Sequence, residues 1–297
     1  MLLLDLGVFH RKSERVSVRA ALGWTAFWVI LSLCFNGWVW NQFGQEKGME
    51  FLAGYILEKS LSVDNLFVFL LIFNYFKVPP EVQHRVLFFG ILGALVLRGV
   101  FIYLGATLVH QFHWILYLFG AFLVFSGIKL LFLDDDDEQN PENAVVKAFR
   151  ARLRLTDRFH DDKFWVRKEG LLYATPLFLV LIAVETSDVL FAVDSIPAIF
   201  GVTDDTFVVY TSNVMAILGL RALYFALAGL LEYFHYLNYG LAFVLIFIGA
   251  KMLGENYIDL SIAVELGVIA VLLIGAILAS MLFPKKIEPD QEVETDA

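Results

Sequence analysis

The sequence has few charged residues and a single cysteine. Charged residues make up 18% of the 297 and hydrophobic residues 59%, whereas soluble domains are about half apolar and about one quarter charged. Cys34 alone can build neither a disulfide framework nor a thiolate metal cluster. The apolar residues come in blocks of about 20, the length that crosses roughly 30 Å of hydrocarbon. We therefore expect an all-α, polytopic transmembrane helix bundle.

A basic surface and an activated nucleophile are also missing. The net charge is −9, and nucleic-acid binding would need a basic patch, so nucleic acid is not an expected partner. Ser62, Ser187 and Ser195 have no deep histidine or lysine beside them that could activate them. We therefore expect neither an enzyme nor a prosthetic group.

Eight stretches are long and apolar enough to be spans. They lie near residues 20–40, 50–76, 86–108, 114–133, 171–200, 207–230, 236–253 and 262–283. Lysine and arginine are concentrated in the connections on one side, for example at 147–168, and the other side has almost none beyond Lys47. The positive-inside rule then places both ends of the chain and the central loop in the cytoplasm.

Two parts of the chain resemble each other. The matches are 119–132 with 241–254, 97–104 with 220–227, and Glu58-x5-Asp64-Asn65 with Asp188-x5-Asp194-Ser195. They keep their order, and each unit holds three spans. Because three is odd, the second copy has to be inverted in the membrane. Inverted repeats are typical of secondary transporters, whose sites lie near the bilayer midplane. An ancient duplication without transport is the alternative.

These patterns divide the chain into six segments. We expect an N-terminal stub with the first transmembrane helix at 1–49, a first three-helix repeat at 50–133, a charged cytoplasmic loop at 134–170, a second, inverted three-helix repeat at 171–254, a last transmembrane helix at 255–284, and a disordered acidic tail at 285–297. In the loop, Val146, Phe149 and Leu153 form an apolar stripe among basic residues. This stripe predicts an amphipathic helix on an anionic leaflet.

Five acidic residues fall near the middle of two spans: Glu58, Asp64, Glu185, Asp188 and Asp194. A charge at the centre of a membrane helix costs about 2.5–3.5 kcal/mol, so five unpaired charges facing lipid would cost on the order of 12–18 kcal/mol. These acids must therefore face the bundle interior, where each is paired, protonated or bound to a cation.

Helix geometry limits how these acids can meet. Glu185 and Asp188 are three residues apart and share a face. Asp188 and Asp194 are six apart and lie about 120° from each other on a regular helix, as do the corresponding residues of the first repeat. A common site is easier to form if the helix breaks, and Pro197 favours such a break.

The available ligands are carboxylate, amide and hydroxyl oxygens. Such oxygens suit Mg²⁺, Ca²⁺ or Mn²⁺ and disfavour Zn²⁺ or Cu⁺. A proton relay is one alternative, since chains of Asp and Glu also carry protons. Salt bridges that lock the bundle are another. Further residues that could contribute are Ser62, Glu185, Ser195, Asn213, Arg98 and Arg221, with the two arginines as countercharges. Lys129 and Lys251 lie near span ends, where we expect them to snorkel.

At these motifs the chain resembles the TerC family (tellurium-resistance C, or Alx-type, membrane proteins). The residues that carry the resemblance are Glu58-x3-Ser62-x-Asp64-Asn65-x-Phe67-Val68-Phe69 and Thr186-Ser187-Asp188-x5-Asp194-Ser195-Ile196-Pro197-Ala198. The likeness extends from about residue 18 to about residue 285. Family members usually have a complete helix ending in a segment like 2–12, so the resemblance also implies a ninth span before this point.

The resemblance implies an inner-membrane protein related to the lysine-exporter superfamily, with members linked to Mn²⁺ efflux and others to Ca²⁺ or to the folding of exported proteins. It assigns the metal ligands to Glu58, Asp64, Asn65, Asp188 and Asp194. We therefore expect an exporter of divalent cations, Mn²⁺ first and Ca²⁺ or Mg²⁺ as possible ions, in exchange for protons. A non-transporting scaffold for membrane or exported proteins is the alternative.

Overall fold

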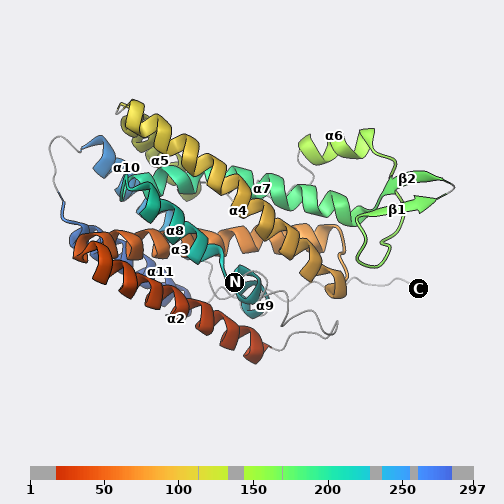
Figure 1. Ribbon diagram of the computed structural model, residues 1–297, viewed down its shortest axis with the longest axis horizontal. Coiled ribbons are helices and arrows are strands. Elements are labelled where there is room, and N and C mark those ends of the chain that lie inside the picture. The colour runs from red at the N-terminus through yellow and green to blue at the C-terminus, as the bar shows by residue number, and fades with distance from the viewer. Residues whose placement is uncertain are drawn as a thin grey trace, which may run out of the picture.

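The computed structural model describes residues 18–112, 114–132, 144–168, 170–227, 236–254 and 260–282, except for the side chains at 18, 64 and 67. The described chain is mainly helical (Figure 1). Its elements are α2 (Val18–Phe43), α3 (Gln45–Tyr75), α4 (Pro80–Gln111), α5 (Ile115–Phe132), α6 (Ala144–Arg152), β1 (Trp165–Lys168), β2 (Leu171–Ala174), α7 (Pro176–Phe200), α8 (Thr206–Ile217), α9 (Leu220–Leu227), α10 (Leu237–Leu253) and α11 (Ile262–Leu282).

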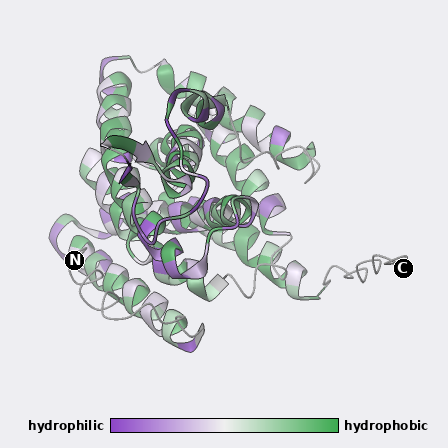
Figure 2. Cartoon of the chain, turned by 90° about the vertical axis from the view of Figure 1, so that its right-hand side faces the viewer, coloured by the Kyte–Doolittle hydropathy of each residue, from purple (hydrophilic) through white to green (hydrophobic). Residues whose placement is uncertain are grey.

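Within the described residues, six helical stretches are long and apolar enough to cross a membrane: α2, α4, α5, α7, α11 and the stretch Thr206–Ala226. This confirms a polytopic helical membrane protein, and Figure 2 shows the hydrophobic colour over most of the helical surface. The two remaining predicted spans also contain helices. α10 is a shorter apolar helix, and α3 has 31 residues but carries several charges in its first half.

The central loop departs from the prediction. Its helix, α6, is confirmed, but Val146 is fully buried in an apolar cluster that also contains Val180 of α7. After α6 comes an unpredicted hairpin, in which Trp165 of β1 pairs with Ala174 of β2. α7 begins only at Pro176 rather than at 171, because proline suits the first position of a helix, where no N–H is needed.

The expected break near Pro197 is wrong. α7 is continuous from Pro176 to Phe200. Pro197 lies in the last turn of the helix, where it frees only the carbonyl group one turn earlier.

A break occurs instead between α8 and α9, in the predicted span 207–230. Leu218 has non-helical backbone angles (φ −59°, ψ 129°), and Gly219 has a positive φ of 82°. A Cβ on Gly219 would lie 2.6 Å from ring atoms of Trp28. Both the backbone angle and the packing therefore require glycine at this point.

The closest helix pair is α5 with α10. A Cβ on Gly120 would lie 2.9 Å from the carbonyl oxygen of Gly249, and a Cβ on Gly127 would lie 2.7 Å from that of Ala242. The contact runs down one helix as it runs up the other, so the two are antiparallel. Small residues let their backbones touch, as is typical of membrane helix pairs.

Two of the three apolar clusters lie one above the other along the same helices, and the third packs α2 against α3 and α8. On α3 the first cluster holds Ala53 and Leu57, and the second begins at Leu66. On α4 the second cluster ends at Ile91 and the first begins at Ile102. On α7 the gap between the two clusters runs from Val184 to Ala192, and on α8 it runs from Val209 to Ile217. A layer about two turns deep is left between them on four helices.

Candidate functional site

The layer between the two apolar clusters is polar. It holds Glu58 of α3, Arg98 of α4, Asp188 of α7 and Asn213 of α8, and each of these residues is at most 3% exposed. The side chains of Ser62, Asn65 and Ser195 are also at most 2% exposed. Because the apolar clusters cover this layer on both sides, its charges are sealed from either end of the bundle.

Arg98 is the centre of the layer. Its guanidinium forms ion pairs with Glu58 and with Asp188, the latter at 3.3 Å between Nη2 and Oδ1. Nη1 also lies 3.4 Å from the hydroxyl of Ser195. Asn213 donates from Nδ2 to the other carboxylate oxygen of Glu58 at 2.9 Å. Charge-assisted bonds of this kind are the strongest that side chains form, so the layer joins four helices.

Asn65 extends the network along α3. In the orientation that satisfies both ends of its amide, Nδ2 donates to the carbonyl oxygen of Leu61 at 3.0 Å. The amide oxygen then accepts from Nη2 of Arg98 at 3.2 Å. Asn65 therefore contributes an oxygen to the same centre as Glu58, as its position in the sequence motif predicts.

Some oxygen atoms in the layer are left without a partner. Oδ2 of Asp188 and the hydroxyl of Ser62 are buried and make no hydrogen bond. A buried unsatisfied polar group costs about 1–3 kcal/mol, and more if it is charged. Glu58 and Asp188 also set two carboxylates against the single guanidinium of Arg98. The Nε of Arg98 is a buried donor without a partner as well. The layer is thus short of positive charge, which a proton or a cation would supply.

One predicted acid lies outside this network. Asp194 is half-buried, and its Oδ1 accepts a hydrogen bond of 3.0 Å from Ser126 of α5. The expectation that it meets Asp188 in one pocket fails for this conformation, since an unbroken α7 directs residues six apart to different neighbours. The Asp64 side chain lies outside the described residues. Arg221 is buried as well.

Glu185 is placed by a glycine of the neighbouring helix. It is half-buried on α7, and a Cβ on Gly93 of α4 would lie 2.1 Å from its Oε1. Its carboxylate therefore fits against the α4 backbone because residue 93 has no side chain.

The described residues contain no group of three or more histidine, cysteine, aspartate or glutamate side chains arranged to hold a metal ion. What the layer offers is two carboxylates, Glu58 and Asp188, with the oxygens of Asn65 and Ser62 nearby. These are all hard donors, which fits Mn²⁺, Mg²⁺ or Ca²⁺. To reach a full coordination shell, an ion would have to displace the guanidinium of Arg98.

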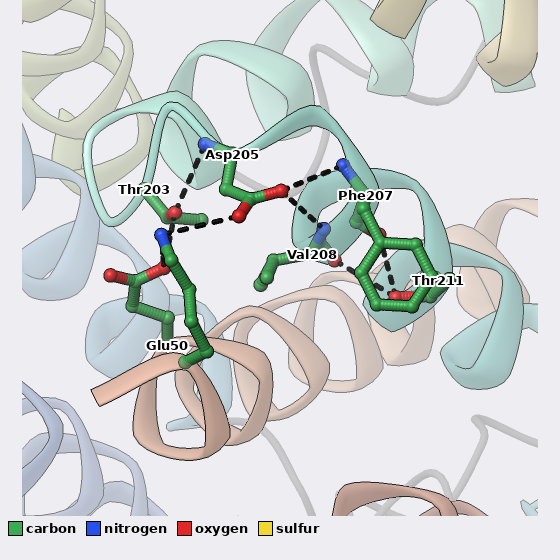
Figure 3. Close-up of polar contacts among 7 residues, drawn as sticks. Glu50, Thr203, Asp205, Phe207, Val208 and Thr211 are labelled. Carbon is green, nitrogen blue, oxygen red and sulfur yellow. Dashed lines mark hydrogen bonds and ion pairs between the residues drawn. The ribbon is translucent and has the colours of Figure 1, made fainter. Parts of the chain in front are cut away.

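Sequence reasoning missed a second polar cluster at the start of α3 (Figure 3). Glu50 accepts from the Thr203 hydroxyl at 2.5 Å and pairs with Lys47 at 2.9 Å. Lys47 also pairs with Asp205 at 3.3 Å, and Asp205 caps α8 by accepting from the N–H of Phe207. The cap motif was visible in the sequence as an aspartate before an apolar run, but the partners from α3 were not.

Lys251 corrects another expectation. Instead of snorkelling alone, its Nζ pairs with the buried Glu265 of α11 at 2.7 Å and donates to the carbonyl oxygen of Gly201 at 3.0 Å. The partner lies on a helix outside both repeats, so the sequence pattern gave no signal for it. Lys129, its counterpart in the first repeat, is exposed.

Together, the polytopic helical fold and the buried polar layer define a helical integral membrane protein with a charged centre. A family model described as integral membrane protein TerC family matches residues 43–288. The chain belongs to this family.

Curated relatives share most of its length. It is 51% identical over 278 residues to the "Putative membrane-bound redox modulator Alx" of Escherichia coli K12, covering 91% of this chain and 87% of the relative. It is 50% identical over 283 residues to the "Uncharacterized membrane protein STKORF319" of Myxococcus xanthus, covering 95% and 88%. A membrane protein of Rickettsia bellii is 41% identical over 282 residues, covering 95% and 93%. No solved structure gives a significant match.

Proposed function

We propose that the protein is an inner-membrane transporter that exports divalent metal cations, Mn²⁺ in the first place, in exchange for protons. The observation that carries this proposal is the polar layer. Two carboxylates, Glu58 and Asp188, share one guanidinium at the level where two apolar clusters meet. Intramembrane ionisable residues of this kind mark ion pathways and proton relays.

The proposed exchange uses the charge balance of the layer. A divalent cation that binds Glu58 and Asp188 replaces Arg98 as their counterion, and the orphaned Oδ2 of Asp188 supplies a further ligand. When the ion leaves, protons and the guanidinium neutralise the carboxylates again. Because metal ligands must be deprotonated, binding of the ion and binding of protons oppose each other.

An inverted repeat would suit this function, and the helix packing supports it. The match of 119–132 with 241–254 makes residue 242 the counterpart of 120 and residue 249 the counterpart of 127. Gly120 packs on Gly249, and Gly127 packs on Ala242, so each residue touches the counterpart of the other. The packing of α3 with α8 is likewise matched by that of α7 with α4. Such reciprocity is what a two-fold relation between two halves produces.

Transport in proteoliposomes tests the proposal. Purified protein should take up Mn²⁺ when a pH gradient is imposed, and Asp188→Asn should remove most of this uptake. Asp204→Asn makes the same chemical change at an exposed position and should leave uptake at the wild-type level. Competition by Ca²⁺ and Mg²⁺ then gives the selectivity. Absence of Mn²⁺ movement in wild-type vesicles with either gradient direction would refute the proposal.

A membrane scaffold is the second candidate, and the ion pairs of Arg98 favour it because they lock three helices together without any ion. In that case the central loop rather than Asp188 should carry activity. Deleting residues 134–168 while measuring Mn²⁺ sensitivity of cells separates the two functions. The name of the Alx relatives suggests a redox role. An internal disulfide cannot carry such a role in these 297 residues, since they hold one cysteine.

A further inference from the structure

The helix that carries Asn213 ends one turn later, inside the bundle. A helix end leaves its last carbonyl groups without partners in the helix. Two side chains from other helices supply donors here. The Ser32 hydroxyl of α2 lies 3.4 Å from the carbonyl oxygen of Met215, and the Lys59 ammonium of α3 lies 3.1 Å from that of Ala216. Side chains of α2 and α3 therefore stabilise the break after α8.

Lys59 is the stronger of these two donors. Its positive charge lies at the carboxyl end of α8, where the helix dipole is negative. Half-helix ends of this kind bind cations in transporters with broken helices. In this chain a tethered ammonium group takes that position. The bond to Ala216 is the one hydrogen bond of Lys59 among the described residues.

Lys59 and Glu58 are adjacent on α3 and hold the same turn of α8. Glu58 accepts from the amide of Asn213 at 2.9 Å, and Lys59 donates to the carbonyl oxygen of Ala216. Residues 213 and 216 are three apart and lie on one face of the helix. Without the contact of Lys59, the carboxyl end of α8 loses its charged donor, and the Asn213 amide can shift relative to Glu58.

We propose that Lys59 is a positioning residue of the polar layer: it fixes the carboxyl end of α8 and thereby holds the Asn213 amide against Glu58. This inference rests on the proposed function for its effect on ion binding, because Glu58 is a ligand there. It adds a residue that neither the acidic motifs nor the ion pairs of Arg98 point to. The ammonium acts through the backbone of α8 and does not touch the ion.

A double-mutant cycle tests it. Mn²⁺ affinity is measured by calorimetry on detergent-purified wild type, Lys59→Met, Asn213→Ala and the double variant. Lys59→Met should weaken binding about tenfold, and the double variant should bind no worse than Asn213→Ala alone, since both changes remove one arrangement. Lys59→Arg, which can still donate to Ala216, should restore most of the affinity. Ser60→Ala is the matched control, because the Ser60 hydroxyl bonds only within α3.

A second measurement separates this inference from the proposed function. The thermal unfolding of the same four proteins is recorded without metal, where coupling between positions 59 and 213 should also appear. Additive effects on unfolding overturn the inference whether or not the protein binds Mn²⁺. Additive effects on affinity, or Lys59→Met binding as tightly as Ser60→Ala, overturn it equally. Lys59→Gln, whose shorter, uncharged side chain brings no ammonium group to Ala216, replaces Lys59→Met if that variant does not fold.

Discussion

Replacing Arg98 with methionine should destabilise the protein and raise its affinity for cations. The guanidinium is 2% exposed and neutralises Glu58 and Asp188 together. Methionine fills a similar volume but leaves two buried carboxylates without a counterion. Breaking a buried ion pair on one side costs about 3–5 kcal/mol. At about 2–4 °C per kcal/mol, the unfolding midpoint should fall by on the order of 10 °C.

The assay is thermal unfolding of purified protein in detergent, with and without Mn²⁺. A ligand at 100 times its dissociation constant stabilises the folded state by about 2.7 kcal/mol. Arg98→Met should gain more from a given Mn²⁺ concentration than the wild type does, because no guanidinium competes for the two carboxylates. A triple variant with Arg98→Met, Glu58→Gln and Asp188→Asn carries no buried charge at these positions. It should recover most of the lost stability and show no response to Mn²⁺.

Two results would refute this reasoning. An Arg98→Met protein that unfolds at the wild-type temperature would show that the ion pairs do not lock α3, α4 and α7 together. An Arg98→Met protein that is destabilised but gains nothing from Mn²⁺, Ca²⁺ or Mg²⁺ would show that the two carboxylates do not form a cation site. The second result would count directly against the proposed transport function.

Two other predictions concern glycine contacts. Gly249→Val should destabilise the protein by about 1–3 kcal/mol in thermal unfolding, as overpacking does, since a Cβ would lie 2.6 Å from the Gly120 carbonyl oxygen; Gly267→Val, with open space around it, is its control. Gly93→Ala should displace the Glu185 carboxylate and lower Mn²⁺ uptake, while Gly99→Ala on the same helix, where a Cβ meets only ordinary contacts, should not. Equal uptake by the two alanine variants would mean that the position of this carboxylate is unimportant.

Hydropathy predicted the helices well because each span is a long apolar block. It could not predict the break at Leu218 and Gly219, since residues on both sides are equally apolar and only the packing of Trp28 on the glycine reveals it. The hairpin of β1 and β2 was hidden for a related reason. Residues 171–174 read as the start of the apolar span that follows them.

The site was predicted in part. The depth of Glu58, Asp188 and Arg98 in their spans is readable from the sequence, and these three residues meet in the structure. Asp194 was expected with them from the family resemblance, and a broken α7 would have made the common site easier to form. Since the helix is continuous, the rotation between positions 188 and 194 directs Asp194 to Ser126 instead. Contacts between elements distant in the chain, such as that of Lys59 with Ala216, leave no pattern in the sequence.

The position of the charged layer between two apolar clusters limits how fast anything could pass. An ion that left the layer would have to cross packed side chains such as Leu57 on one side or Leu66 on the other, where no oxygen replaces its hydration shell. Passage therefore requires one cluster to separate while the other stays closed. The transport proposed for this protein would therefore proceed by turnover, with a saturable rate set by helix movement, and not as a continuous current.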